Sequence, residues 1–432
     1  MSEHLLDHAN PHFVDRVMAL ADEGEVEVAE DIFTDTGVKL LAKGVKLTRS
    51  FQDRLLMHKL QRPLVQSLSV SDGITVDALM LLATMLVDEQ PILARLVDKQ
   101  GVAMLAQHLR NVRLDRVSLL LLTLAHRTEG AAMRHAVLVT LTALALAERL
   151  SLPEPDQINL ATAALLHDIG ELYIDPVVLS GGHLVTPDEW RALAVHPVVG
   201  RKLVADTTGL GPAVARLIGE HHERIDGSGY PRGLSGDEIS PAGQLLAAAE
   251  MTTGLLGKAS DTQARLDLAL KVMSSGHAPE VMSCLRKALA GQAPSAGLAL
   301  YTVSSVLTAV NRLVWSLDAV RAAISRAEVD ADNLESRELV AEVESRFNGL
   351  HRAFLRTGLG SVPVSEISSA LFDAAADELT ESMGIIDEIN WRLRELARFA
   401  ALRIGLLKPV ERHGLDSLLA AIADPLRQSH PA

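Results

Sequence analysis

Residue types that bind metal ions are concentrated in one stretch of about eighty residues. Four histidines and two acids stand out there, in the order His167-Asp168, His196, His221-His222 and Glu250. Imidazole nitrogen and carboxylate oxygen are the ligands that borderline transition metals prefer, and two neighbouring ions need several such ligands to converge. We therefore interpret this stretch as a metal site of the kind that hydrolyses a phosphate ester.

The spacing of these residues is more informative than any single one. A lone histidine on an apolar helix face is usually a hydrogen-bonded core residue, and chance His-Asp pairs are common. The adjacent pair His221-His222 is rarer. Because neighbouring imidazoles at a helix end diverge, both can contribute only to a site with more than one ion.

The segment after the histidine pair predicts a tight loop. It reads Asp226-Gly227-Ser228-Gly229-Tyr230-Pro231. Asp226 could bind a metal, brace a histidine, or only open the turn. Gly227 and Gly229 either let the backbone approach a ligand closely or permit a positive φ. Tyr230 could pack on a base and donate its hydroxyl to phosphate, or it could anchor the core.

Predicted helices position these residues. They are expected at 133–150, 156–166, from 186 to 196, and from 211 to 222. The first would place His135 near its N-terminal end, and the second would end at the His-Asp pair. Thr186 as cap and Pro187 at the first position predict the start of the third, which would carry His196 at its far end.

Composition favours a helical protein of several domains. A chain of 432 residues exceeds one ordinary core. It is 48% hydrophobic but only 3% aromatic, which favours amphipathic helices over a β-sandwich. The net charge of −14 repels polyanions, so DNA and RNA are not expected as partners, although a local cation site could hold a small anionic nucleotide.

The expected environment is the cytoplasm. The single cysteine, Cys284, suits a reducing compartment and is most simply a small buried hydrophobe. The N-terminus lacks a basic region followed by an apolar core, so no signal peptide is expected. The longest apolar run, near Val117 to Ala125, is far short of the ~20 residues that a membrane span needs.

The chain divides into four predicted segments. Residues 1–70 form a small module with short β-strands, 71–127 a helical connector, 128–290 the catalytic domain, and 291–432 a C-terminal helical bundle. The fold class is therefore mainly α. The bundle is a candidate surface for homodimerisation or a signalling partner, or it is only a stabilising extension.

Two motifs resemble those of the HD-GYP family, a branch of the HD phosphohydrolases. They are His167-Asp168-Ile169-Gly170 and the eleven residues from His221 to Pro231. The second match is highly specific, and the likeness covers about residues 128–260. The resemblance implies an all-helical, metal-dependent fold of the HD type that hydrolyses cyclic di-GMP with iron or manganese.

The resemblance also assigns roles to individual residues. The metal ligands it implies are His135, His167, Asp168, His196, His221, His222 and Glu250. The substrate-binding residues it implies are Arg224, Gly229, Tyr230 and Pro231. Asp168 is the expected catalytic residue, because it could bridge two metals and orient the attacking water. Glu250 stands where the family usually has Asp.

Other positions depart from the family pattern. Glu171 replaces a lysine, Gln244 an arginine and Thr253 a second aspartate, and Lys258 is the only cation near a missing basic stretch. Ala131 stands where members with three metals have a glutamate, which favours two metals. Fewer cations should weaken binding of a dianionic dinucleotide, by roughly 1.5–3 kcal/mol for each charge-assisted hydrogen bond lost.

These observations lead to one expected function and two alternatives. The expected function is a phosphodiesterase of cyclic di-GMP, or of a related cyclic dinucleotide, in bacterial signalling. The first alternative is a catalytically degenerate member that binds a nucleotide or a protein without turnover. The second is a phosphohydrolase that acts on a different nucleotide. Intact metal ligands favour an enzyme, and the charge changes favour the alternatives.

Overall fold

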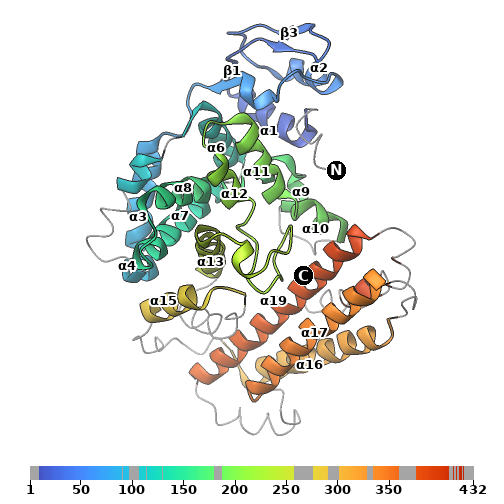
Figure 1. The fold of residues 1–432 in the computed structure, drawn as a ribbon. Helices are drawn as coiled ribbons and strands as arrows, with labels where there is room; N and C mark the ends of the chain where they lie inside the picture. Colours follow the sequence, from blue (N-terminus) through green and yellow to red (C-terminus); the bar gives the residue numbers. More distant parts are fainter. Residues whose placement is uncertain are drawn as a thin grey trace. The chain divides into compact units, whose positions relative to one another are not determined.

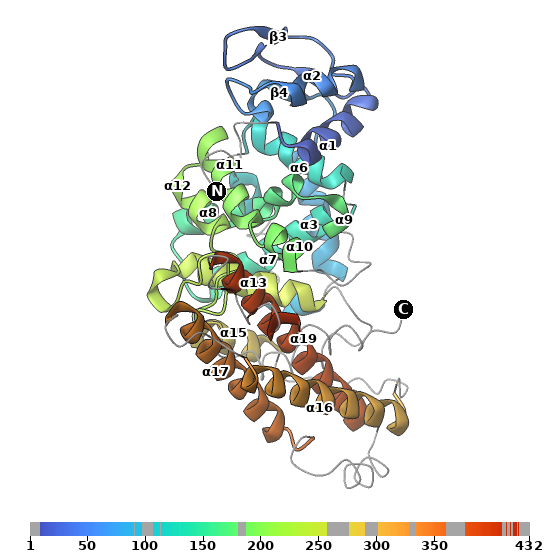
Figure 2. The ribbon, with the colours of Figure 1, turned by 90° about the vertical axis from the view of Figure 1, so that its right-hand side faces the viewer.

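The structure, a computed structural model, forms two compact units (Figure 1, and Figure 2 in a second view). It describes residues 9–89, 91–96, 107–112, 114–128, 130–179, 187–256, 276–289, 301–327, 334–359 and 376–407, with 412, 415, 418–420 and 422. The first unit comprises Met1–Gly181, Ala192–Gly257 and Ser275–Leu289. The second comprises Gly182–Arg191, Lys258–Ser274 and Ala290–Ala432. Helices dominate the described residues, which confirms the mainly α class.

The N-terminal part of the first unit carries the short strands that the sequence predicts. It begins with α1 (Pro11–Asp22), after which β1 (Val26–Val28) pairs antiparallel with β4 (Leu68–Val70). β2 (Ile32–Phe33) pairs with β3 (Lys39–Leu41) across a turn in which Gly37 has a φ of +84°. Between β3 and β4 lie η1 (Arg49–Phe51), α2 (Gln52–Met57) and η2 (Leu64–Ser67).

The helix α7 (Ala132–Arg149) lies at the centre of the first unit. Every residue from Ala136 to Ala147 is buried, as expected for a helix that is apolar on all sides. It packs against α8 (Glu154–Leu166), α13 (Pro241–Leu256), α3 (Val76–Glu89), α4 (Pro91–Leu96), α6 (Arg116–Thr128) and α15 (Pro279–Leu289). The helices predicted at 133–150 and 156–166 are thus confirmed within two residues.

A second group of short elements covers the C-terminal end of α8. It consists of η3 (Ile169–Tyr173), α9 (Pro176–Leu179), α11 (His196–Thr207), α12 (Pro212–Ile218) and η4 (Gly236–Glu238). α11 packs against both η3 and α12, and α12 packs against α8. Among the described helices, none combines the length and apolar character needed to cross a bilayer.

Two predicted helix ends are wrong. α10 (Pro187–Leu193) ends before His196, which instead begins α11. Pro197 explains the break, because a proline is tolerated in the first turn of a helix but would remove a hydrogen bond from the interior. The helix predicted to reach His222 stops at Ile218, so the histidine pair lies in the turn that follows. Thr186, the predicted cap of α10, lies outside the described residues.

The second unit contains three long helices that pack on one another. They are α16 (Val303–Ser325), α17 (Leu334–Arg356) and α19 (Ala376–Leu406). Apolar residues at helical spacing form the core, and the guanidinium of Arg346 lies 4.0 Å from the ring centroid of Phe399.

Glycine allows η3 and α11 to approach backbone to backbone. A Cβ atom added to Gly170 would lie 2.1 Å from the carbonyl oxygen of His196 and 2.9 Å from the amide nitrogen of Gly200. These atoms belong to the backbone of α11 and cannot move aside as a flexible side chain can. The close approach holds the residues beside it, Asp168 and His196, near each other.

We expect Gly170→Ala to destabilise the first unit by about 1–3 kcal/mol, the usual cost of overpacking. Urea unfolding followed by circular dichroism measures the change. Gly254→Ala is the matched control, because a Cβ atom at this exposed position of α13 meets nothing within 4 Å. The control should be neutral or slightly stabilising, since alanine favours a helix. Equal losses in the two variants would contradict the steric argument.

Candidate metal centre

The predicted ligands come from the ends of helices and from the turns beside them. His135 lies in the first turn of α7, and His167 caps the C-terminal end of α8. His196 is the first residue of α11. His221 and His222 follow α12, whereas Glu250 lies within α13. The structure therefore brings residues from five separate helices to one place.

Three of the histidines are oriented by the same hydrogen bond. In each, Nδ1 contacts a backbone carbonyl three residues earlier: His167 with Ala164 at 2.7 Å, His196 with Leu193 at 2.8 Å, and His221 with Ile218 at 2.7 Å. A carbonyl can only accept, so Nδ1 must carry the proton. The neutral ring then presents an unprotonated Nε2, which is the form that ligates a metal.

These Nε2 atoms face one another and two carboxylates. The ligand atoms fall into two groups, within each of which they lie no more than 4.8 Å apart. The first group, called here the aspartate group, is Asp168, His196, His221 and His222. The second, the glutamate group, is His135, His167 and Glu250.

Asp168 lies between the two groups. Its Oδ2 is 2.9 Å from Nε2 of His167 and 3.7 Å from that of His135. Its Oδ1 is 3.4 Å from Nε2 of His196 and 3.6 Å from that of His221. One oxygen therefore faces each group, which is the arrangement by which a carboxylate can bridge two cations.

Buried atoms in the centre fit a bound cation. Nε2 of His196 and Nε2 of His221 are 3.0 Å apart, although neither carries a proton in the neutral forms described above. Oε2 of Glu250 lies 2.9 Å from Nε2 of His135 and 3.3 Å from that of His167. Among the described residues, Nε2 of His167 and Oε2 of Glu250 nevertheless have no aligned hydrogen bond. A positive ion would satisfy all of these lone pairs.

Burial and the facing charges set the pKa values of the glutamate group. Burial opposes charge on every member, and it lowers the pKa of an imidazole. The carboxylates outweigh burial, so the pKa of His135 is raised and that of His167 is raised well above its ordinary value. The imidazoles in turn hold the pKa of Asp168 and Glu250 well below the usual range, against the effect of burial.

The histidine pair behaves differently. Burial, reinforced by neighbouring imidazoles, lowers the pKa of His221 to about 4 and lowers that of His222 well below its usual value. The pKa of His196 is raised because Asp168 and Glu171 outweigh burial. At neutral pH both carboxylates are therefore ionised and the histidine pair is neutral, as metal binding requires.

The loop after the histidine pair folds back on it. The ring of Tyr230 stacks on that of His222, with centroids 4.6 Å apart, and its amide donates to the His222 carbonyl at 3.1 Å. A Cβ atom on Gly229 would lie 2.3 Å from the amide nitrogen of Arg224, so only glycine allows this approach. The bond between Tyr230 and Pro231 is cis.

Asp226 opens the turn, which is one of the three roles that the sequence left open for it. Its Oδ1 accepts a hydrogen bond from the amide of Ser228 at 2.9 Å, and it belongs to neither ligand group. Glu223, to which we assigned no role from sequence, holds the end of the loop. Its carboxylate is 1% exposed and accepts from the amides of Arg232 and Leu234, both at 2.9 Å. The only sequence feature that could have pointed to Glu223 was its place beside the histidine pair.

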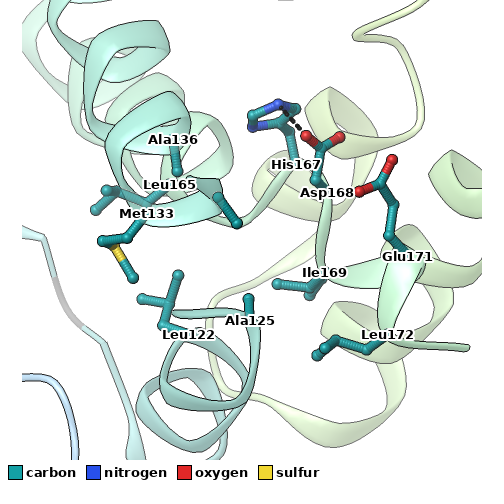
Figure 3. A pocket seen from close by; sticks show the side chains of 11 residues that line it. Leu122, Ala125, Met133, Ala136, Leu165, His167, Asp168, Ile169, Glu171 and Leu172 are labelled. Atoms are coloured by element: carbon teal, nitrogen blue, oxygen red, sulfur yellow. Dashed lines mark ion pairs between the residues drawn. The ribbon is translucent and has the colours of Figure 1, made fainter. Parts of the chain in front are cut away.

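A pocket adjoins the metal centre. Its apolar wall comes from α6, α7, α8 and η3, and it is lined by Leu122, Ala125, Ala132, Met133, Ala136, Leu165, Ile169 and Leu172. In Figure 3 the carboxylates of Asp168 and Glu171 lie with His167 at one end, opposite Leu122 and Met133. A negative side chain thus stands where the family pattern has a lysine.

The other departures from the family pattern carry no charge toward the centre. The side chain of Gln244 is held by the backbone just before it in sequence, because its Nε2 donates to the carbonyl of Ile239 at 3.2 Å. The hydroxyl of Thr253 is buried and donates to the carbonyl of Ala249 at 2.7 Å. Ala131 precedes α7 and offers no ligand atom. Lys258 lies outside the described residues.

Comparison with known proteins identifies the domain that holds this centre. Residues 118–279 match the HD domain family. A 3'3'-cGAMP-specific phosphodiesterase of Vibrio cholerae is 35% identical over 38% of this chain and 35% of its own length. A cyclic di-GMP phosphodiesterase of Pseudomonas aeruginosa is 39% identical over 24% of this chain and 26% of its own length.

The matched segments thus span about a third or less of these relatives. The solved structure of an HD-GYP-type protein from Bdellovibrio bacteriovorus is 18% identical and covers 61% of this chain and 95% of its own. Its TM-score is 0.34, too low for details of the folds to be compared. The HD domain match and the sequence relatives, together with the residues from His221 to Pro231, support an HD domain of the HD-GYP type over residues 118–279 of this chain.

Proposed function

We propose that this chain is a metal-dependent phosphodiesterase that hydrolyses cyclic di-GMP or a related cyclic dinucleotide. The observation that carries the proposal is the pair of ligand groups with Asp168 between them. Two relatives are named as enzymes for cyclic di-GMP and 3'3'-cGAMP, which are both cyclic dinucleotides with phosphodiester linkages. A pocket lined in part by His167, Asp168 and Glu171 adjoins the groups.

The seven predicted ligands would hold two divalent transition metal ions, iron or manganese. Imidazole and carboxylate suit these ions, and the donor set offers one group for each. Bound ions of this kind supply a water of lowered pKa and neutralise charge on the phosphoryl oxygens. Asp168, the proposed catalytic residue, lies between the two groups, where its carboxylate would orient that water.

The loop after the histidine pair is proposed to bind the substrate. Tyr230 is held against His222 and presents a ring and a hydroxyl beside the aspartate group. The backbone of Gly229 lies against that of Glu223 and Arg224, and Gly229, Pro231 and Arg224 are proposed to bind the substrate with it. The C-terminal helices are proposed as a surface for a second copy or a signalling partner, with Trp315 of α16 52% exposed.

One observation favours a second candidate, a member that binds nucleotides without turnover. The carboxylate of Glu171 lies at the metal end of the pocket, where an anionic substrate would meet it. Repulsion there opposes binding of a dianion in a productive position. The two candidates differ in turnover by the metal-loaded protein, which the following experiments measure.

Asp168→Asn should lower turnover of cyclic di-GMP by the manganese-loaded chain at least about 100-fold, because an amide cannot bridge two cations. The product is measured by chromatography after anaerobic metal loading. Asp206→Asn is the matched control: it is the same change on α11, at a side chain whose ion pair is with Lys202. Turnover should be unchanged there. If the wild type itself shows no turnover with metal bound, the enzyme proposal is wrong.

Metal affinity should fall as the pH is lowered toward the ordinary histidine pKa of 6.5. The pKa values of His135, His167 and His196 are raised above it, so these rings take up protons at a higher pH than an ordinary histidine, and the protons must leave before a metal binds. Competition with a fluorescent chelator measures the apparent Kd of manganese at each pH. An affinity that does not change with pH would show that these imidazoles are not ligands.

Glu171→Lys should lower KM for cyclic di-GMP about tenfold or more, because it replaces a repulsive charge by one that can donate a charge-assisted hydrogen bond. Steady-state kinetics measure the change. The matched control is Glu154→Lys, the same charge reversal on the exposed first turn of α8, at the opposite end from His167. A similar fall in KM in the control would mean that net charge alone acts.

A further inference from the structure

The helix α1 lies outside the region that matches the HD domain family, yet it packs against η3. Arg16 is the main contact. Its guanidinium is buried, with the residue 5% exposed, and Nη1 donates to the carbonyl oxygens of Leu172 and Ile174, both at 2.9 Å. A buried charge without such acceptors would be costly, so this arginine specifies where η3 must lie.

Two further residues of this segment support the same contact. Nδ2 of Asn10 donates to the carbonyl oxygen of Tyr173 at 3.2 Å, and the ring of Phe13 stacks on that of Tyr173 with centroids 4.7 Å apart. Three consecutive carbonyls, of residues 172 to 174, therefore accept hydrogen bonds from Asn10 and Arg16. The end of η3 is fixed in position by side chains 156 to 163 residues away in sequence.

The other side of η3 meets the metal centre. η3 begins directly after Asp168, and Gly170 lies against the carbonyl of His196 at the start of α11. The segment is thus held between α1 and α11. Asp168 and His196 both belong to the aspartate group. A shift of η3 would therefore change the distances within this group before those within the glutamate group.

The glutamate group is held in another way. His135 lies on α7 and Glu250 on α13, and these helices pack on each other. His167 caps α8, which also packs on α7. These contacts do not involve α1, so a change at Arg16 should leave the three side chains in place.

We propose that Arg16 is a positioning residue for one of the two metal positions, the one formed by the aspartate group. The inference rests on the proposed two-metal function, but it concerns metal binding and not the substrate. Arg16 acts through backbone carbonyls of η3, which fix Asp168 relative to His196. The metal-binding unit of this chain thus includes a helix from its N-terminal module.

The test measures manganese binding by the full-length chain in two backgrounds. His135→Ala leaves the aspartate group complete, and His222→Ala leaves the glutamate group complete. Arg16→Gln should raise the Kd for manganese about tenfold in the first background, the lower end of the effect of losing a direct partner of a metal ligand, because Arg16 acts one step further away through the backbone of η3. In the second background the Kd should change less than about twofold. Arg16→Lys, which keeps one donor, should restore part of the affinity.

Electron paramagnetic resonance of the otherwise wild-type chain gives an independent readout. Two manganese ions in neighbouring positions give an exchange-coupled spectrum, and Arg16→Gln should convert it to that of an isolated ion at limiting metal. Equal losses of affinity in both backgrounds would overturn the proposal, as would a lowered Tm with unchanged metal binding.

Arg116→Gln is the matched control. Arg116 of α6 likewise donates to two backbone carbonyls of the N-terminal module, those of Gln66 and Leu68, but these lie far from η3 in the chain. The control should leave both affinities unchanged, and an effect equal to that of Arg16→Gln would overturn the proposal.

If Arg16→Gln does not fold, a milder variant tests the same contact with η3. Asn10→Asp keeps the acceptor that caps α1 through the amide of Phe13 but removes the donor to Tyr173. It should raise the Kd of the aspartate group alone, by a smaller factor, and no change in that Kd would count against the proposal. If both ions bind as described but no cyclic dinucleotide is cleaved, the proposed function fails while this inference stands.

Discussion

Two ring nitrogens 3.0 Å apart, Nε2 of His196 and Nε2 of His221, set the main constraint on this structure, because in the neutral rings described above both are unprotonated. Each ring has its proton on Nδ1, where a backbone carbonyl accepts it. The two facing lone pairs repel unless a proton or a cation lies between them. The fold therefore holds an arrangement that is favourable only with positive charge at its centre.

Helix ends and turns make this arrangement possible. A carbonyl near the end of a helix lacks its usual amide partner, so it can accept from an imidazole that follows it. His167 and His221 use this acceptor at the ends of α8 and α12, and His196 uses the carbonyl at the end of α10. The same local hydrogen bond thus satisfies orphan carbonyls and directs three candidate ligand atoms into the metal centre, one in the glutamate group and two in the aspartate group.

Much of this centre could be predicted from sequence, because its ligands are marked by residue type. The paired histidines and the loop after them carry the resemblance to the HD-GYP family, and apolar periodicity located α7 and α8. The sequence was interpreted with His196 at the far end of one helix, whereas that helix ends at Leu193 and His196 begins α11. The pattern did not reveal that Pro197 would lie in the first turn of the next helix together with His196.

Other features depend on contacts that no local pattern records. Arg16 resembles any arginine of an amphipathic helix, and only the folded chain reveals that its guanidinium is buried against η3. Glu223 reads as one acid among many until its two backbone donors are seen. Asp168 could be assigned as a ligand from sequence, but its place between two groups follows from the packing of five helices.

The positions that depart from the family pattern affect metal binding and substrate binding differently. Ala131, Gln244 and Thr253 lie outside both ligand groups, and the two polar side chains among them bond to nearby backbone carbonyls. Among the departures at described residues, only Glu171 brings a changed charge to the pocket. Because a carboxylate favours bound cations and opposes bound anions, one substitution can strengthen the hold on metal while weakening that on a phosphodiester. Intact metal ligands are therefore compatible with altered substrate preference, and turnover has to be judged separately from metal content.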